Sequence, residues 1–340
     1  MLIPLALKEN SCDIVLERGC LAEAGRLLDL KRRVLIVTDT GVPAEYPRML
    51  SAQCAESVTV TLPEGEDSKS TDHFLLLLRR MLSEGFTRGD CVAAVGGGMP
   101  GDVAGFASAC YMRGIDFYNI PTTLLAQVDS SVGGKTAIDL DGIKNVIGAF
   151  HQPRRVLIDP DTLGTLPDRQ WSNGLAEAVK MALCFDAEGF SLFERSDPRV
   201  HVTEIIERAL RVKTRVVEQD EKDQGLRQTL NFGHTLGHGI ESLHGENGLL
   251  HGECVALGML PMCGEAVRER LRAVLEKLGL PTRGAAPASA VMRALLHDKK
   301  MKNGAVSAIL CDEIGTCRVQ TMRPEEIRAR YLSTFPEALP

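Results

Sequence analysis

Cys91-Val-Ala-Ala-Val-Gly-Gly-Gly-Met-Pro-Gly-Asp-Val-Ala-Gly105 is the stretch that decides the fold class of this chain. Its first five residues are apolar and predict a buried strand, and the glycine-rich turn after them leads into a predicted helix. Gly96, Gly98 and Gly101 satisfy a G-x-G-x-x-G pattern in the strand–turn–helix setting of dinucleotide-binding folds. Where no Cβ intrudes, the backbone can approach a pyrophosphate closely, and the helix N-terminus offers free N–H groups.

The glycine turn is a weak indicator by itself, because three glycines also make an ordinary tight turn. A standard dinucleotide fold places an acidic residue at the end of the next strand, about 20 residues further on. Asp116 has that spacing but stands early in its strand, before Phe117-Tyr-Asn-Ile. The standard fingerprint is therefore not satisfied, and we expect a nucleotide at this turn to be held differently.

Further strands and helices are predicted on both sides of the turn. Apolar runs predict strands at 34–37, 58–62 and 115–120, and 74–84 has helical character. This alternation implies βαβ units, hence an α/β domain over 1–165 with a mostly parallel, Rossmann-like sheet. Residues 166–340 predict a mainly α-helical domain, with one β-hairpin in 305–319 around Glu313-Ile-Gly and helices at 174–184, 203–217, 233–243, 253–278 and 288–297.

Composition restricts the class of protein. The 340 residues, 44% hydrophobic and 25% charged, suit a globular protein with two sizeable cores. A net charge of −6 argues against a general nucleic-acid binder. The N-terminus has no secretory pattern, and no apolar run reaches membrane-spanning length. Ten cysteines stand singly, which favours reduced, buried thiols. We therefore expect a cytoplasmic protein with no nucleic-acid or membrane partner.

Four of the eight histidines, His234, His238, His244 and His251, fall within residues 231–253. His234 and His238 form an i, i+4 pair, which places both on one face of a helix in the geometry of a two-histidine metal site. Spacing alone therefore favours these two as metal ligands, with a carboxylate from elsewhere. The alternative is a histidine-bearing helix and loop that bind nothing.

Other polar residues are candidates for ligand binding. Glu177 lies in an apolar helical stretch near Lys180, so it should coordinate a cation, pair with a base or face solvent; a simple surface pair with Lys180 is equally possible. Residues 122–136 are densely polar, and Gly133-Gly-Lys135 offers a phosphate cradle without the Walker A spacing. We favour a ligand site there over a solvated loop. Five bases could hold an anionic substrate, although each could simply be solvated: Arg113, Lys213, Arg227, Lys299 and Lys300.

Together these motifs resemble those of the 3-dehydroquinate synthases, in the sugar phosphate cyclase family. The similarity is dense from about residue 96 to 253, and so many motifs in the same order make chance agreement negligible. They are Gly96-Gly-Gly-x-x-Gly-Asp102, Tyr111-Met-Arg-Gly114, the polar stretch Pro121-Thr-Thr-Leu-Leu-Ala-Gln-Val-Asp-Ser-Ser-Val-Gly-Gly-Lys-Thr136, Lys144-Asn145, Gly148-Ala-Phe-His-Gln-Pro153, Leu175-Ala-Glu177, Asn231-Phe-Gly-His-Thr-Leu-Gly-His238 and His251-Gly-Glu253.

The resemblance implies a phosphorus–oxygen lyase of the shikimate pathway, which leads to chorismate and the aromatic amino acids. Such an enzyme converts 3-deoxy-D-arabino-heptulosonate 7-phosphate to 3-dehydroquinate and phosphate. It does so by transient oxidation of the substrate by NAD, phosphate elimination, re-reduction and intramolecular aldol closure. The resemblance also implies a divalent metal (zinc or cobalt), a homodimer, and an active site in the cleft between an NAD-binding domain and a metal- and substrate-binding domain.

The resemblance also implies a set of site residues. The metal ligands are Glu177, His234 and His251, which replaces the pair chosen by spacing. Residues that hold the substrate are Lys135, Asn145, Lys180, Lys213, Arg227, Asn231, His238 and Lys299, with Arg113 near the site of the partner subunit. NAD is bound by Asp39, Glu64, Gly65, Glu66, Asp67, Ser68, Lys69, Gly97, Gly98, Met99, Pro100, Gly101, Asp102, Thr122, Thr123, Asp129, Lys135, Lys144, Thr162, Leu163, Gly164 and Thr165.

Some positions depart from the family pattern. Asp223 replaces the usual Glu, residues 139–144 differ from the usual Asn-Leu-x-x-Gly-Lys, and Pro100 occupies a loop position that is often aliphatic. None of these removes a ligand or a phosphate-binding base. Two alternative enzymes are another sugar phosphate cyclase, against which Lys213 and Arg227 argue, and a metal-dependent NAD alcohol dehydrogenase. An inactive NAD- or metabolite-binding module is the alternative outside the enzymes.

Overall fold

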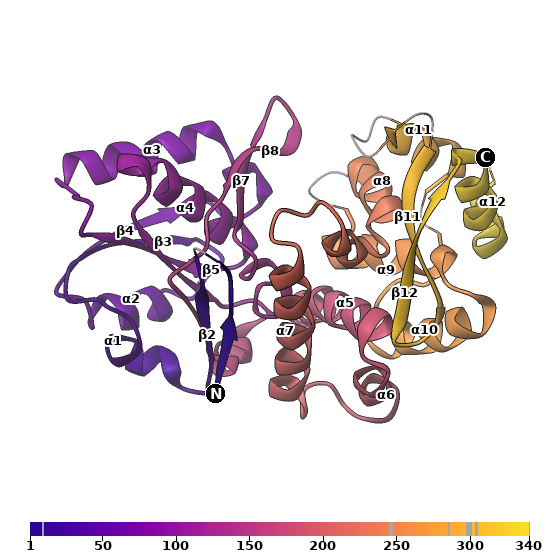
Figure 1. Cartoon of the computed structure of the whole chain (residues 1–340), viewed down its shortest axis with the longest axis horizontal. Coiled ribbons are helices and arrows are strands. Elements are labelled where there is room, and N and C mark those ends of the chain that lie inside the picture. The colour runs from indigo at the N-terminus through magenta and orange to yellow at the C-terminus, as the bar shows by residue number, and fades with distance from the viewer. Residues whose placement is uncertain (9, 245–247, 285, 297–300, 303–304, 340) are drawn as a thin grey trace. The chain divides into compact units, whose positions relative to one another are not determined.

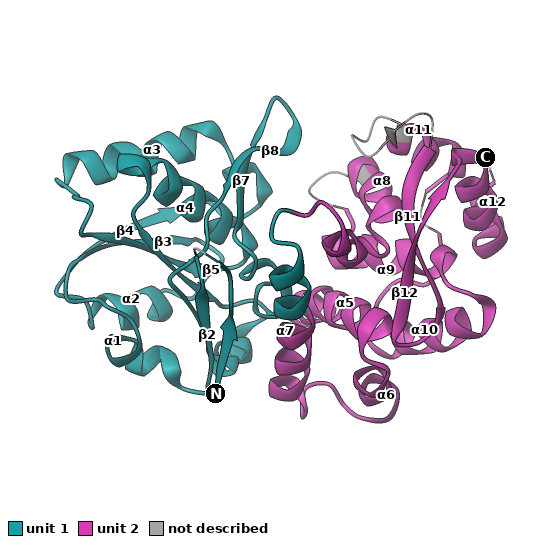
Figure 2. Ribbon diagram, in the orientation of Figure 1, with its two compact units in different colours: residues 1–167, 213–222 teal, residues 168–212, 223–340 magenta. Residues whose placement is uncertain are grey.

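The computed structural model describes residues 1–340 except 9, 245–247, 285, 297–300, 303–304 and 340. The described chain divides into two compact units, shown in teal and magenta in Figure 2. The first unit comprises residues 1–167 and 213–222, and the second comprises 168–212 and 223–340. Helix α7 (Val202–Gln219) therefore begins in the second unit and ends in the first, which a boundary at 165/166 does not include.

A seven-stranded sheet forms the centre of the first unit (Figure 1). Across the sheet the strands are β1 (Leu2–Leu5), β2 (Cys12–Leu16), β9 (Arg155–Ile158), β6 (Asp116–Pro121), β5 (Cys91–Gly96), β3 (Arg33–Asp39) and β4 (Glu56–Leu62). Only β1 and β2 pair antiparallel, and every other neighbouring pair is parallel. The predicted α/β class with a mostly parallel sheet is confirmed.

Helices cover both faces of this sheet. The unit contains α1 (Ala24–Leu27), α2 (Glu45–Ser51), α3 (Thr71–Ser83), α4 (Gly98–Cys110), and the short helices η1 (Cys20–Glu23), η2 (Glu66–Ser68), η3 (Tyr111–Arg113), η4 (Ala126–Ser130) and η5 (Pro160–Thr165). Strand β5 is buried throughout, and its residues alternate between two cores. Cys91, Ala93 and Val95 pack in the core with α1 and α2. Val92 and Ala94 pack in the core with α3 and α4. Because the side-chain period of a strand is two, this uninterrupted apolar run supplies both faces.

An antiparallel hairpin of β7 (Lys135–Leu140) and β8 (Ile143–Phe150) completes the first unit. Its strands were not predicted, because the run of glycine, serine and lysine before them is typical of a loop. Gly134 has φ +66°, and a Cβ there would lie 2.6 Å from the Gln152 side chain. Glycine is therefore required where the chain enters β7.

The second unit is mainly helical, as predicted. Its helices are α5 (Asp168–Phe185), α6 (Ala187–Arg195), the first part of α7, η6 (Leu226–Asn231), α8 (His234–His244), α9 (His251–Met259), η7 (Leu260–Met262), α10 (Glu265–Lys277), α11 (Ala288–Leu296), α12 (Pro324–Thr334) and η8 (Pro336–Ala338). An antiparallel sheet holds β10 (Met301–Lys302), β11 (Ala305–Glu313) and β12 (Thr316–Met322), which confirms the hairpin. Within the described ranges, no helix combines the length and apolarity needed to cross a membrane.

The single helix predicted over 253–278 is wrong, because the chain forms α9 and α10 with η7 between them. Pro261 removes a backbone donor inside the predicted helix. Two residues later the backbone becomes extended at Cys263, and the Gly264 N–H donates to the Cys311 carbonyl of β11 at 2.9 Å. This hydrogen bond ends one helix and fixes the start of the next.

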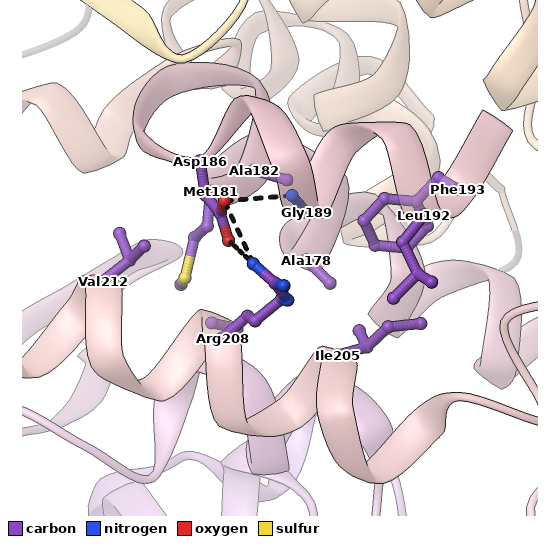
Figure 3. Close-up of a pocket in the computed structure, with 11 residues that line it drawn as sticks. Ala178, Met181, Ala182, Asp186, Gly189, Leu192, Phe193, Ile205, Arg208 and Val212 are labelled. Carbon is purple, nitrogen blue, oxygen red and sulfur yellow. Dashed lines mark hydrogen bonds and ion pairs between the residues drawn. The ribbon is translucent and has the colours of Figure 1, made fainter. Parts of the chain in front are cut away.

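Helices α5, α6 and α7 surround a solvent-open hollow of about 260 Å³ (Figure 3). Asp186 caps α6 by accepting from the Gly189 N–H at 3.0 Å. The same carboxylate lies 3.0 Å from Arg208 of α7, which also pairs with Glu188 and Glu204. The charge of Arg208 is thus balanced by three carboxylates, and this contact fastens the three helices together.

Candidate active site

Three helices of the second unit bring the predicted metal ligands together. Glu177 lies in the middle of α5, while His234 and His251 are the first residues of α8 and α9. One ligand atom from each lies within 4.8 Å of the others. The Nε2 atoms of His234 and His251 are 3.7 Å and 3.5 Å from Oε1 of Glu177. One carboxylate and two imidazoles are a donor set used by catalytic zinc sites, which keep a coordination position open.

Each imidazole is oriented through its other nitrogen. Nδ1 of His234 donates to the Phe232 carbonyl at 3.1 Å, and Nδ1 of His251 donates to the Glu241 carboxylate at 3.1 Å. Because Nδ1 of each ring donates elsewhere, Nε2 of each ring faces Glu177, where it would offer its lone pair to a metal ion once it is deprotonated. This preorganised arrangement fits a divalent ion. Sequence reasoning missed Glu241, although its i, i+7 spacing from His234 places both on one face of α8.

The carboxylate at the centre of the set is deeply buried. Glu177 is 1% exposed, and it forms an ion pair with Lys180, which is 2% exposed. Burial opposes protonation of His251, but hydrogen bonds with Glu177 and Glu241 outweigh it and raise the pKa of His251 to about 10. Cationic partners therefore balance the buried charge, as a divalent ion would. Glu177 and Lys180 therefore form a buried ion pair, and the alternative of a solvent-exposed surface pair is wrong.

The i, i+4 partner of His234 lies beside the cluster. The His238 ring is exposed, 5.2 Å from the His234 ring and 6.1 Å from the His251 ring by centroids. It belongs to a second possible ligand group with Glu241 and His251. Helical spacing thus located the cluster but selected His238 as the second ligand. The buried Glu177 carboxylate is instead grouped with His234 and His251. Nothing is described of the His244 side chain.

In the first unit, the glycine turn joins β5 directly to α4. Gly97 is the extended N-cap residue and Gly98 begins the helix. A Cβ on Gly98 would lie 3.1 Å from Oγ of Ser130, and one on Gly101 would lie 3.2 Å from the Asn119 amide. The glycines thus let polar side chains pack closely against the N-terminus of α4, and the free N–H groups of a helix N-terminus suit phosphate binding.

Pro100 lies in the first turn of α4, not in a loop as expected. Proline is tolerated there because the N–H groups of the first turn have no acceptor within the helix. Its ring lies over the turn, since a Cβ on Gly96 would be only 2.9 Å from Cγ of Pro100. The proline therefore stiffens the turn and keeps the helix intact.

The predicted segment 64–69 meets this turn through a buried lysine. Nζ of Lys69, 5% exposed, lies 2.8 Å from Asp102 and 3.2 Å from Glu66. Burial raises the pKa of Asp102 to about 6, against the opposing effect of Lys69. The Asp139 N–H donates to the Lys69 carbonyl at 2.7 Å, which attaches the hairpin to the same place.

Asp39 and Glu64 also lie close together, at the ends of β3 and β4. The Asp39 carboxylate accepts from the Gly41 N–H at 2.8 Å. A Cβ on Gly41 would be 2.5 Å from the Glu64 carboxylate and 3.2 Å from that of Asp39. Burial raises the pKa of Asp39, and the charge of Glu64 adds to this. These two strands are neighbours, so their ends meet at one sheet edge.

Gln127 connects two more predicted segments, and sequence reasoning did not identify it. Its fully buried amide donates to the carbonyls of Pro121 and Asp159 and to the hydroxyl of Thr162, at 3.0–3.1 Å. The chain after β6, which carries Thr122 and Thr123, is thereby fastened to η5, which carries Thr162, Leu163, Gly164 and Thr165. A glutamine inside a predicted polar loop has no sequence signal for such a role.

Two predicted lysines lie near the same turn. Lys213 of α7, 6% exposed, forms an ion pair with Asp129. Lys135 lines a solvent-open hollow of about 220 Å³ together with Gly101, Asp102 and Ser130. The hollow joins the glycine turn to the Gly133-Gly-Lys135 segment, two stretches that the sequence suggested separately.

Comparison with known proteins agrees with these features. Residues 59–173 match the model of the 3-dehydroquinate synthase N-terminal region, and residues 174–301 match that of the 3-dehydroquinate synthase C-terminal region. A 3-dehydroquinate synthase of Pelobacter propionicus is 42% identical over 344 residues, covering 94% of this chain and 96% of that protein. The chain belongs to the 3-dehydroquinate synthase family. The family predicted from the motifs is confirmed, and the protein is an enzyme.

Solved structures place this family member among the sugar phosphate cyclases. The 2-epi-5-epi-valiolone synthase of Streptomyces hygroscopicus subsp. jinggangensis 5008, with NAD⁺ and Zn²⁺ bound, is 30% identical with a TM-score of 0.87, over 97% of this chain and 98% of that one. A 2-deoxy-scyllo-inosose synthase has a TM-score of 0.88 at 24% identity, over 98% and 100% of the two chains. The second likeness shows a shared fold.

The other predicted residues of this 3-dehydroquinate synthase family member lie on η6, on β8 and on the short helix after α4. Arg227, 3% exposed, and Asn231 belong to η6. Lys144 and Asn145 lie on β8, where the Asn145 N–H donates to Asp139 at 2.7 Å. Arg113 is exposed, with φ +71°. Lys299 lies outside the described residues, as does Lys300.

Proposed function

We propose that the chain converts 3-deoxy-D-arabino-heptulosonate 7-phosphate to 3-dehydroquinate and phosphate in the cytoplasm. The observation that carries this proposal is the convergence of Glu177, His234 and His251 in a chain of the 3-dehydroquinate synthase family. We assign NAD binding to residues 1–165, and metal and substrate binding to residues 166–340. Residues 213–222, which group with the first unit, contribute Lys213.

The three converging side chains would hold a zinc or cobalt ion, with Glu241 fixing the orientation of His251. When bound, the ion supplies Lewis acidity to a substrate hydroxyl, and NAD⁺ supplies reversible hydride acceptance at that carbon. The donor set is the support for the metal. NAD⁺ and Zn²⁺ are bound in the related valiolone synthase structure.

NAD would lie against the sheet edge where β3, β4, β5 and β6 end. The N-terminus of α4 would supply N–H groups for the pyrophosphate, next to glycines that carry no side chain. Asp39 offers a carboxylate to a ribose hydroxyl. The Lys69–Asp102 ion pair holds segment 64–69 against the turn. These two residues would therefore position the NAD-binding segments as well as contact NAD.

The substrate would be held mainly by cations. Arg227 is nearly inaccessible to solvent, and a buried guanidinium suits bidentate recognition of a phosphate or carboxylate. The Lys180 ammonium lies beside Glu177, where it can donate a hydrogen bond to a substrate oxygen next to the metal. His238 would face the substrate from the rim of the cluster, and Lys135, Asn145, Lys213, Asn231 and Lys299 would complete the set.

In this reaction the side chains of the protein need to transfer few protons. Oxidation of one carbon acidifies its neighbouring C–H, and oxygens of the substrate phosphate can take that proton as phosphate leaves. The chain's contribution is to hold the reacting groups in position and to stabilise negative charge through Lys180, Arg227 and Lys213.

Turnover tests this proposal. The purified chain, loaded with Zn²⁺ and given NAD⁺ and the heptulosonate phosphate, should release phosphate and 3-dehydroquinate in a one-to-one ratio. Because the hydride is returned, no lasting absorbance of NADH should develop. NADH that accumulates in step with turnover would point to an alcohol dehydrogenase instead. Phosphate release from a different sugar phosphate alone would point to another cyclase.

We also propose a homodimer in which Arg113 reaches the site of the partner subunit. Its exposed side chain and positive φ, on the short helix after α4, support a role beyond its own fold. A mixture of inactive Arg113→Ala and inactive His251→Ala chains should recover activity if each dimer can assemble one intact site. Failure to recover, with mixed dimers demonstrated, would contradict the exchange of Arg113.

A further inference from the structure

His251 is the first residue of α9, and the start of a helix is held by few of the helix's own hydrogen bonds. The N–H groups of the first turn have no acceptor within the helix, and helix ends fray. The N-cap residue of α9 is Leu250, whose side chain carries no acceptor. A metal ligand at this position therefore needs other groups to fix the backbone around it.

Asn173 of α5 supplies the acceptor that Leu250 lacks. Its Oδ1 accepts from the N–H of Gly252, the residue after His251, at 2.6 Å. An N-cap side chain would make the same hydrogen bond. A Cβ on Gly252 would lie 2.1 Å from the Asn173 carbonyl oxygen, so only glycine allows the first turn of α9 to approach α5 this closely.

Arg169 and Glu253 hold the same turn through a second set of contacts. The Glu253 carboxylate accepts from the Leu250 N–H at 2.7 Å. Its two oxygens also accept from Nε and Nη2 of Arg169, both at 2.8 Å, which makes a bidentate pair. Nη2 of Arg169 donates in addition to the Gly248 carbonyl at 2.7 Å. One guanidinium is thus bonded to residues on both sides of His251 in the chain.

These contacts come from the face of α5 that carries the central carboxylate of the site. Arg169, Asn173 and Glu177 follow one another at intervals of four residues, so they form one row along the helix. The first two hold the start of α9, and the third is the metal ligand. The hydrogen bond from Nδ1 to Glu241 orients the ring of His251, whereas the row fixes the backbone that carries this ring.

We propose that Arg169, Asn173 and Glu253 are positioning residues for the metal centre, which set the place of His251 relative to Glu177. In the described part of the chain, none of the three belongs to a group of possible metal ligands, so each acts through His251. The inference rests on the proposed function, because it takes the metal ligands of that proposal.

Arg169→Ala tests the positioning role. The Arg169 side chain is 55% exposed, and exposed ion pairs contribute little to folding stability, so the variant should fold. We expect zinc affinity to fall about tenfold, the lower end of the effect of such partners, because Arg169 acts through the backbone and not on the ring. Competition with a zinc-binding dye measures it. With cobalt in place of zinc, the visible absorption bands should shift, since they report the geometry of the ligands around the ion.

Arg270→Ala is the matched control. Arg270 of α10 makes the same bidentate pair, at 2.8 Å and 2.9 Å, with Glu194 of α6, and its side chain is 51% exposed. This pair joins α6 to α10 instead of α5 to α9, so zinc affinity and the cobalt spectrum should not change. Arg169→Lys keeps the charge without the two parallel hydrogen bonds. Its zinc affinity should lie between those of Arg169→Ala and the unsubstituted chain.

A double variant tests whether Arg169 and Glu253 act as one unit. Glu253→Gln combined with Arg169→Ala should bind zinc no more weakly than the weaker of the two single variants, because each single change already breaks the bidentate pair. Losses of affinity that add would contradict the pairing. Urea unfolding of the metal-free protein should give similar midpoints for Arg169→Ala and Arg270→Ala, which separates position from stability.

Two results would overturn the proposal. The first is an unchanged zinc affinity and cobalt spectrum in Arg169→Ala. The second is an equal loss of affinity in Arg169→Ala and Arg270→Ala, which would show a general effect of stability. These measurements need no substrate, so the two proposals fail separately. A chain that binds zinc without converting the heptulosonate phosphate contradicts the proposed function alone, and an active chain indifferent to Arg169→Ala contradicts the positioning role alone.

Discussion

The two units build their candidate sites in opposite ways. In the first unit, the ends of adjacent parallel strands present backbone, and the absence of side chains at Gly97, Gly98 and Gly101 lets polar side chains pack closely against the helix N-terminus. In the second unit, side chains from α5, α8 and α9 converge on a buried carboxylate. The backbone site depends on the absence of side chains at the glycines. The side-chain site depends on the residues that orient its ligands. Substitutions should therefore act on the two sites through different mechanisms and with separate readouts.

The largest effect should come from removing a metal ligand. His251→Ala should abolish stoichiometric zinc content and reduce turnover by at least about 10³-fold, because only one carboxylate and one imidazole would remain. Metal content is measured by elemental analysis after gel filtration. NAD affinity in the first unit should change little. His201→Ala, which removes a partly exposed histidine before α7, is the matched control. Full zinc retention by His251→Ala would refute the ligand assignment.

The next effect should come from the carboxylate behind His251. Glu241→Gln keeps the shape of the side chain but weakens the hydrogen bond that orients Nδ1 of His251. Loss of such a partner typically lowers metal affinity about 10–100-fold. Competition with a zinc-binding dye would measure it. Glu204→Gln, on the surface of α7, should leave affinity unchanged. Equal affinity for both variants would mean that Glu241 has no orienting role.

Metal affinity should also depend on pH. In the metal-free protein the pKa of His251 is about 10, above its ordinary 6.5, so the site is protonated near neutral pH. Zinc must displace that proton, and affinity should rise about tenfold per pH unit between 7 and 9. Calorimetry in buffers of different ionisation enthalpy should detect about one proton released per ion from this group. A pH-independent affinity in that range would contradict the assignment.

The same pKa shift bears on the stability of the metal-free protein. The proton on His251 stabilises the folded state in full below pH 6.5, and this contribution is lost as the pH rises through 10. Urea unfolding of the metal-free chain should therefore show a smaller free energy of unfolding at pH 9 than at pH 7, relative to His251→Ala. The reverse slope would show that the group is not protonated in the folded protein.

The smallest effect should come from the backbone site. Gly98→Ala places a Cβ 3.1 Å from Oγ of Ser130, next to the expected pyrophosphate. Crowding of this kind costs about 1 kcal/mol, or roughly fivefold in NAD affinity, with zinc content unchanged. Fluorescence titration with NADH would measure it. At Gly89 an added Cβ meets only ordinary contacts, so Gly89→Ala is the control. An unchanged NADH affinity in Gly98→Ala would place the nucleotide elsewhere.

The same contrast explains how much could be predicted from the sequence. The β5–turn–α4 unit is contiguous, so apolar runs and glycine spacing were enough to predict it. The ligands Glu177, His234 and His251 come from three helices, and periodicity within one helix could only suggest His238. Resemblance to the family supplied His251. Glu241 and Gln127 were missed because their partners lie far along the chain or in the backbone, which local patterns do not encode.

Elements without a periodic pattern were also missed. The β7–β8 hairpin follows a glycine- and serine-rich stretch, and its strands are partly exposed. The helix predicted over 253–278 ignored Pro261, whose effect depended on a hydrogen bond from Gly264 to β11. In both cases a tertiary contact decided the local structure.

The position of the metal tests the account most directly. Crystals grown with zinc, with anomalous diffraction recorded on both sides of the zinc edge, would locate the ion without reference to activity. We predict one strong peak within coordination distance of the Glu177 carboxylate and of Nε2 of both His234 and His251. A peak held instead by His238, Glu241 and His251, the second group in this region, would contradict the account.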